Sequence, residues 1–140
     1  MSADGKVRVL VIDGYREERQ YWADCLRMSS KHYEVIEAQD GRSGIQLCQA
    51  TLIHCVVLEI LLPDISGFGV LRGLCHMPPP SKCAVVVLTR IDYPSLLDLA
   101  QKNGAMASLA KSHTTCHELD RAITRATGMA RNRTMAGPSH

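Results

Sequence analysis

Leu52-Ile53-His54-Cys55-Val56-Val57-Leu58-Glu59 is the stretch of sequence that decides the fold. It is the core of the strongest apolar run in the chain, which continues through Ile60-Leu61-Leu62 and ends before Pro63. A short apolar run of this kind favours a strand that is buried on both faces. An acidic residue at its end is expected at the rim of a sheet, where open α/β folds keep their functional groups. Glu59 is therefore the first candidate functional residue.

Short apolar segments alternate with segments of helical periodicity on both sides of this run. We expect strands at 6–12, 33–38, the run ending at Glu59, 83–88 and 106–110, and helices at 15–28, 40–48, 67–75, 93–102 and 118–127. Asp40 suits an N-cap, and Pro94 suits the first turn of its helix. Five strands alternating with five helices predict an α/β domain in which helices cover both faces of a parallel sheet.

The composition is typical of one soluble globular domain. The chain has 140 residues, of which 46% are hydrophobic and 21% are charged. The net charge of +2 is too small to indicate a nucleic-acid or membrane partner. Because no apolar segment is long enough for a membrane span or a signal segment, we expect a cytoplasmic protein. We expect the domain to cover residues 1–128, and residues 129–140 to form a flexible basic tail.

The six cysteines lack the paired spacing of zinc sites. They are residues 25, 48, 55, 75, 83 and 116. Several lie in apolar segments, where a free thiol behaves as a small hydrophobic group. We therefore expect buried, reduced cysteines, with a metal site at Cys75-His76 or Cys116-His117 as the minor alternative.

Four polar residues each follow a predicted strand: Asp13, Glu59, Thr89 and Lys111. Right-handed crossovers between parallel strands place the carboxyl ends of all strands along one edge of the sheet. We therefore expect these four side chains to lie together, although they come from separate segments.

Four motifs in order give the chain a family resemblance. They are Val9-Leu10-Val11-Ile12-Asp13, Leu58-Glu59-Ile60-Leu61-Leu62-Pro63-Asp64-Ile65-Ser66-Gly67, Val87-Leu88-Thr89, and Gly104-Ala105 followed by Lys111. Over about residues 6 to 127 the chain resembles the receiver domain of two-component response regulators. The resemblance implies a flavodoxin-like fold, with a five-stranded parallel sheet of order 2-1-3-4-5. It also implies a pocket in which two acids after the first strand and an aspartate after the third hold Mg²⁺. That aspartate accepts a phosphoryl group, whose oxygens are contacted by a Thr or Ser and a Lys.

The chain departs from this pattern at the positions that carry the chemistry. The acid pair is Asp13-Gly14, and Glu59 stands at the phosphoacceptor position. The extra methylene moves the carboxylate by about 1.5 Å, away from the in-line geometry of phosphoryl transfer. We therefore expect no metal site, with Asp13 and Glu59 as weak candidate ligands.

Three further departures are Arg90 after Thr89, Ser108 in place of the usual aromatic residue, and Ser112 in place of the usual proline. We expect Asp13 to pair with Lys111, and the Arg90 guanidinium is within predicted reach of Glu59. Whether the Thr89 hydroxyl faces the pocket stays open. For Glu59 three interpretations remain: a structural ion pair with Lys111 or Arg90, an imitation of a phosphoryl group, and residual phosphoryl acceptance.

The resemblance and the departures together predict an atypical receiver that is not an enzyme, has no cofactor and acts through protein–protein contact. The expected partner is a histidine kinase or another signalling domain. The family's docking face, here around 93–101, 106–110 and 116–125, is also the expected homodimer face. The alternative is a phosphorelay response regulator that still binds Mg²⁺ and is phosphorylated by a histidine kinase.

Overall fold

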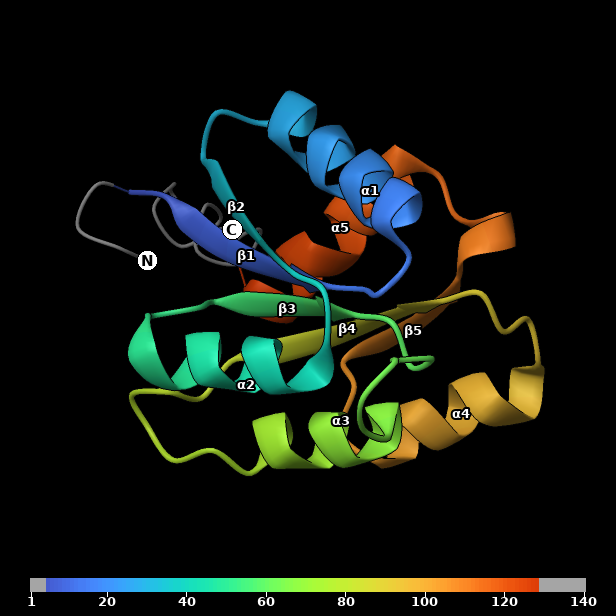
Figure 1. The fold of residues 1–140 in the computed structure, drawn as a ribbon. Coiled ribbons are helices and arrows are strands. Elements are labelled where there is room, and N and C mark those ends of the chain that lie inside the picture. The colour runs from blue at the N-terminus through green and yellow to red at the C-terminus, as the bar shows by residue number, and fades with distance from the viewer. Residues whose placement is uncertain (1–4, 129–140) are drawn as a thin grey trace, which may run out of the picture.

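The computed structural model describes residues 5–128, which form a central five-stranded parallel sheet between two layers of helices (Figure 1). In chain order the elements are β1 (Val7–Ile12), α1 (Arg16–Ser29), β2 (Tyr33–Ala38), α2 (Gly41–Ala50), β3 (Cys55–Leu58), α3 (Gly67–Cys75), β4 (Ala84–Thr89), α4 (Pro94–Lys102), β5 (Ala107–Ala110), the 3₁₀ turn η1 (Lys111–His113) and α5 (Cys116–Thr127). The strand order is β2-β1-β3-β4-β5, and the predicted flavodoxin-like fold is confirmed. The predicted tail at 129–140 lies outside the described residues.

The helices α2, α3 and α4 cover one face of the sheet, and α1 and α5 cover the other (Figure 1). Successive side chains of a strand point to opposite faces, so β1 supplies both halves of the core. Leu10 and Ile12 pack under α2 and α3, whereas Val9 and Val11 pack with Trp22 of α1. This burial on both faces explains why the central strands are continuously apolar.

Several helix ends lie where the sequence predicts them. The Asp40 side chain accepts a hydrogen bond from the Ser43 N–H at 2.8 Å and caps α2 as expected. The last helix begins two residues before the predicted start at Glu118. Thr115 and Glu118 form a capping box, in which each side chain accepts a hydrogen bond from the other's backbone N–H, so the first helical residue is Cys116.

Gly67 is required by a close contact where α3 begins beside the end of β3. A Cβ atom at this position would lie 2.1 Å from the carbonyl oxygen of Ile60. This steric requirement, rather than an unusual backbone conformation, fixes glycine at the entry of the helix.

Two cysteines differ from the expectation of reduced thiols. Cys25 of α1 and Cys116 of α5 form a disulfide, with their Cα atoms 5.8 Å apart. They are 91 positions apart in sequence, so spacing along the chain gives no sign of their proximity. Cys48, Cys55, Cys75 and Cys83 are free thiols. Within residues 5–128, neither Cys-His pair belongs to a cluster of three metal-ligating side chains.

Within the described range, no helix combines the length and the apolar character needed to cross a bilayer.

Candidate functional site

The candidate site lies at the edge of the sheet where the strands end. Asp13 follows β1, Glu59 follows β3, Thr89 ends β4 and Lys111 opens the turn after β5. The parallel register pairs Ile12 with Leu58, which brings the first two residues level. Asp13, Glu59 and Thr89 are only 3%, 1% and 0% exposed, and they are the buried polar residues of the described chain. The buried carboxylates of the described residues therefore both lie at this edge.

The Glu59 carboxylate is held by four donors. Its Oε2 accepts hydrogen bonds from the Thr89 hydroxyl and from the Leu61 N–H at 3.0 Å. Its Oε1 accepts one from the Arg90 backbone N–H at 3.0 Å and lies 2.9 Å from Lys111 Nζ. A carboxylate has about four lone-pair positions, so both oxygens are saturated. The Thr89 hydroxyl thus faces the site, which the sequence left open.

Lys111 connects three carboxylates. Its Nζ lies 2.7 Å from Asp13 Oδ2, 2.7 Å from Glu18 Oε1 and 2.9 Å from Glu59 Oε1. Burial acts to lower the pKa of Lys111, but the hydrogen bonds to Asp13 and Glu18 and the charge of Glu59 outweigh it, and the pKa is raised. Lys111 therefore stays charged, and it pairs with Asp13 as predicted.

Burial raises the pKa of Asp13 above its usual value, although the hydrogen bonds from Lys111 and from the Tyr15 N–H oppose the shift. Burial and the contact with Lys111 therefore act in opposite directions on the Asp13 carboxyl group.

The structure adds two residues that sequence reasoning missed, Glu18 and Tyr15. The Arg90 guanidinium donates from Nε to Glu18 Oε2 at 2.9 Å and lies with its Cζ 3.4 Å from the centroid of the Tyr15 ring. The hydrogen bond from Arg90, followed by that from Lys111, lowers the pKa of Glu18 to about 2. The sequence placed the Arg90 guanidinium within reach of Glu59, but this guanidinium binds Glu18 instead. Only the backbone N–H of Arg90 contacts Glu59.

Gly14 and Ser108 lie differently from the four central residues. A Cβ atom on Gly14 would be 2.9 Å from Cδ of Pro63 and 3.3 Å from the carbonyl oxygen of Gln39, so the space for a second acid is restricted. The Ser108 hydroxyl donates to the carbonyl oxygen of Leu97 in α4 at 2.7 Å. Ser108 therefore links β5 to α4 and is not among the donors of Glu59.

Asp13, Glu18 and Glu59 each offer a carboxylate oxygen within 4.8 Å of the others, an arrangement that invites comparison with a Mg²⁺ site. Mg²⁺ requires oxygen ligands at about 2.0–2.1 Å in octahedral geometry. The Lys111 ammonium already contacts all three carboxylates, and a divalent cation among them would have to displace it. The residues as arranged do not fit Mg²⁺.

Comparisons with known proteins agree with this fold. The model of the response regulator receiver domain matches residues 9–124. The probable chemotaxis protein CheY of Rhizobium etli is 28% identical over 114 residues, which cover 81% of this chain and 88% of that protein. Protein PilH of Pseudomonas aeruginosa is 26% identical over 105 residues, which cover 74% of this chain and 84% of that protein. A crystal structure of a response regulator receiver domain protein from Clostridium thermocellum is similar with a TM-score of 0.77 and 26% identity, and the match covers 91% of this chain and 98% of that one.

Proposed function

The chain belongs to the response regulator receiver domain family. Within this family, we propose that it is an atypical receiver whose pocket works without phosphorylation. In this proposal Glu59 is a permanent occupant of the position where the family's aspartate carries a phosphoryl group. The module signals by binding a protein, has no catalytic output and needs no cofactor.

One observation carries the proposal: the contacts of Glu59 are those that the family makes to a phosphoryl group. The Thr89 hydroxyl and Lys111 Nζ both contact the Glu59 carboxylate. The Arg90 and Leu61 N–H groups complete the set. A carboxylate carries one negative charge and two oxygens, whereas a phosphoryl group carries about −1.5 to −2 and three oxygens. Glu59 therefore matches a phosphoryl group only partly in charge, but it makes the same two side-chain contacts, with Thr89 and Lys111.

The same contacts disfavour phosphoryl acceptance. An acceptor oxygen must approach the donor in line, with reacting atoms about 3–3.5 Å apart. The Glu59 side chain is 0% exposed, and each of its oxygens already has two partners. Transfer to Glu59 would have to break these contacts first.

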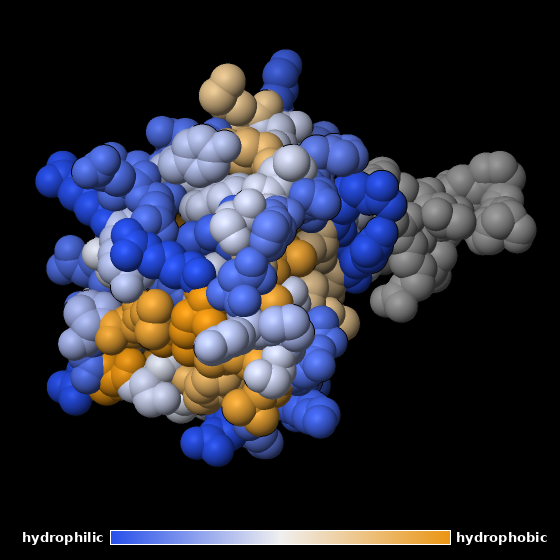
Figure 2. All heavy atoms as spheres, turned by 90° about the vertical axis from the view of Figure 1, so that its right-hand side faces the viewer, coloured by the Kyte–Doolittle hydropathy of each residue, from blue (hydrophilic) through white to orange (hydrophobic). Residues whose placement is uncertain are grey.

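Receiver domains interact with kinases and other proteins, and we propose such a partner here. Large apolar side chains are exposed on and near α4, where Tyr93 is 67%, Leu99 is 47% and Met106 is 61% exposed. Figure 2 shows a hydrophobic area in the lower half of the face that includes the carboxyl edge of the sheet. The face formed by α4, β5 and α5 is the proposed docking surface and homodimer surface.

The proposed location is the cytoplasm.

The proposal is tested by incubating the protein with Mg²⁺ and acetyl phosphate and measuring its intact mass. We expect the native chain to keep its mass. The double variant Glu59→Asp with Gly14→Asp is expected to gain the mass of one phosphoryl group, because it restores both acids of the family pattern. Gly14→Ala is the matched control, since it introduces the same contact with Pro63 without a carboxylate. Phosphorylation of the native chain that Glu59→Gln abolishes would contradict the proposal.

The second candidate function is phosphoryl acceptance. In this case the protein would be a response regulator of a phosphorelay that binds Mg²⁺ in its own pocket. The observation in its favour is the convergence of the three carboxylates of Asp13, Glu18 and Glu59. It requires Lys111 to leave these carboxylates when a cation arrives. The same mass measurement decides between the two candidates.

A further inference from the structure

We propose that Cys25 and Cys116 form a reversible redox pair, which a small disulfide such as oxidised glutathione closes and which then ties α1 to α5. The structure joins these two residues in a disulfide, with a Cα–Cα distance of 5.8 Å. This distance lies within the range of about 4.4–6.8 Å that natural disulfides span. The two helices are neighbours on the same face of the sheet (Figure 1). This proposal does not depend on the one above.

Cys116 is the residue that suits the first step. It is half-buried, and it is the first residue of α5, directly after the Thr115 cap. The N-terminus of a helix favours a thiolate, which is the reactive form of cysteine. Cys25 is 8% exposed and suits the second, internal step.

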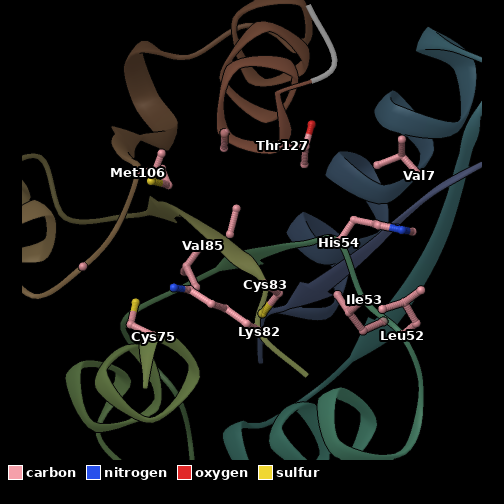
Figure 3. Close-up of a pocket in the computed structure, with 13 residues that line it drawn as sticks. Val7, Leu52, Ile53, His54, Cys75, Lys82, Cys83, Val85, Met106 and Thr127 are labelled. Carbon is pink, nitrogen blue, oxygen red and sulfur yellow. The ribbon is translucent and has the colours of Figure 1, made fainter. Parts of the chain in front are cut away.

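The remaining thiols have different surroundings. Burial raises the pKa of Cys55, which holds this thiol in its unreactive form. The hydrogen bond with Cys83 and burial raise the pKa of Cys48. Cys75 and Cys83 line a pocket at the opposite edge of the sheet, where the strands begin (Figure 3). The oxidation of Cys75 and Cys83 is therefore the control with which the oxidation of Cys25 and Cys116 is compared.

The reaction has two thiol–disulfide exchange steps. The Cys116 thiolate attacks one sulfur of oxidised glutathione, forms a mixed disulfide and releases one glutathione thiolate. The Cys25 thiolate then attacks the Cys116 sulfur and releases the second glutathione. Two cysteine thiols are oxidised, one glutathione disulfide is reduced, and two protons pass from the cysteines to the glutathione thiolates.

The redox pair joins the same two parts of the chain as an ion pair of the pocket. Glu18 lies on α1, and Lys111 opens the segment that leads to α5, with Nζ and Oε1 2.7 Å apart. Two links between the same elements favour each other, and the coupling is reciprocal. Forming the disulfide is therefore expected to stabilise the ion pair between Lys111 and Glu18. In this way the redox state of the two cysteines is coupled to the pocket.

The experiment equilibrates the full chain in glutathione buffers of graded ratio, blocks free thiols with N-ethylmaleimide and maps the modified cysteines by peptide mass spectrometry. We expect Cys25 and Cys116 to lose their label together, with a midpoint inside the range of ratios, while Cys75 and Cys83 stay labelled. Dithiothreitol added to the folded protein is expected to restore both labels. Oxidation is expected to raise the thermal unfolding midpoint by about 10 °C, because the bond closes a long loop.

Cys116→Ser and Cys83→Ser form the matched pair of variants. The first is expected to abolish the oxidation-dependent rise of the unfolding midpoint, and the second is expected to keep it. Glu18→Gln is expected to make the disulfide easier to reduce by about 2- to 5-fold in the equilibrium constant, the effect of one partly exposed ion pair. An unchanged constant would refute the link to the pocket.

Three results would overturn the redox pair itself. The first is full labelling of Cys25 and Cys116 in every buffer. The second is a bond between Cys75 and Cys83 instead. The third is a Cys25–Cys116 bond that dithiothreitol reduces only after unfolding, which would make it a permanent structural link.

Discussion

Replacing Lys111 with methionine removes the single ammonium that contacts three carboxylates. Methionine keeps most of the aliphatic length, so the packing of the stem is largely retained. Glu18 is 33% exposed and can turn to water, but the side chains of Asp13 and Glu59 are only 4% and 0% exposed. Two buried carboxylates then keep their neutral donors and lose their cation. Leaving a buried charge without its partner costs about 3–5 kcal/mol, which corresponds to a fall of roughly 10 °C in the unfolding midpoint of a domain of this size.

The loss of stability in Lys111→Met is expected to depend on pH and on divalent cations if unpaired carboxylates are its cause. Lys111 lowers the pKa of Asp13, so its removal raises further a pKa that burial already raises. A group whose pKa is raised in the folded state gains stability as the pH falls, so the deficit of Lys111→Met is expected to shrink in acid. With the ammonium gone, the three carboxylates can take a divalent cation, and millimolar Mg²⁺ or Mn²⁺ is expected to restore part of the lost stability.

The assay is thermal and urea unfolding of the native chain and Lys111→Met, each with and without divalent cation, at neutral and acidic pH. Lys102→Met is the control, because Lys102 is an exposed lysine of α4. It is expected to unfold like the native chain under all conditions. A Lys111→Met variant as stable as the native chain would refute the reasoning, and so would an equal Mg²⁺ stabilisation of both proteins.

Two further predictions follow from single contacts. Because the pKa of Glu18 is lowered from 4.5 to about 2, its contribution to stability is complete above pH 4.5 and is lost as the pH falls from there towards 2. Urea unfolding across this range is expected to show a smaller loss in Glu18→Gln than in the native chain, and equal losses would contradict the assignment. Gly67→Ala is expected to destabilise the fold by about 3 kcal/mol, because its Cβ would meet the Ile60 carbonyl oxygen, which no rotamer change can move. Gly73→Ala in the same helix has nothing within 4 Å and is expected to stabilise by about 0.5–1 kcal/mol; a similar effect of both substitutions would refute the steric argument.

The main-chain architecture and the central residues of the site were predictable from the sequence. Asp13, Glu59, Thr89 and Lys111 each follow an apolar strand, and parallel topology alone brings strand ends together. The side-chain partners of the next layer were not predictable in the same way. Glu18 and Tyr15 lie at the start of α1, and their contacts depend on how that helix is rotated against the sheet. The position of the Arg90 guanidinium depends in turn on Glu18.

Long-range proximity accounts for the other differences. The Cys25–Cys116 bond depends on the packing of α1 against α5, which no local pattern records. The start of α5 was predicted late because its periodic apolar residues begin at Leu119, whereas the capping box that sets its start begins at Thr115. In this case a Thr three residues before a Glu was the available signal.

The central claim is that Glu59 already makes the contacts of a transferred phosphoryl group and that Lys111 fills the place of a cation. Its most direct test is a titration of the native chain with Mg²⁺ and beryllofluoride, a phosphoryl analogue, followed by the NMR signals of the Leu61 and Arg90 amides. Both amides donate to Glu59. The account predicts that neither signal moves up to millimolar ligand. A saturable shift of both signals that requires Mg²⁺ and beryllofluoride together would contradict it.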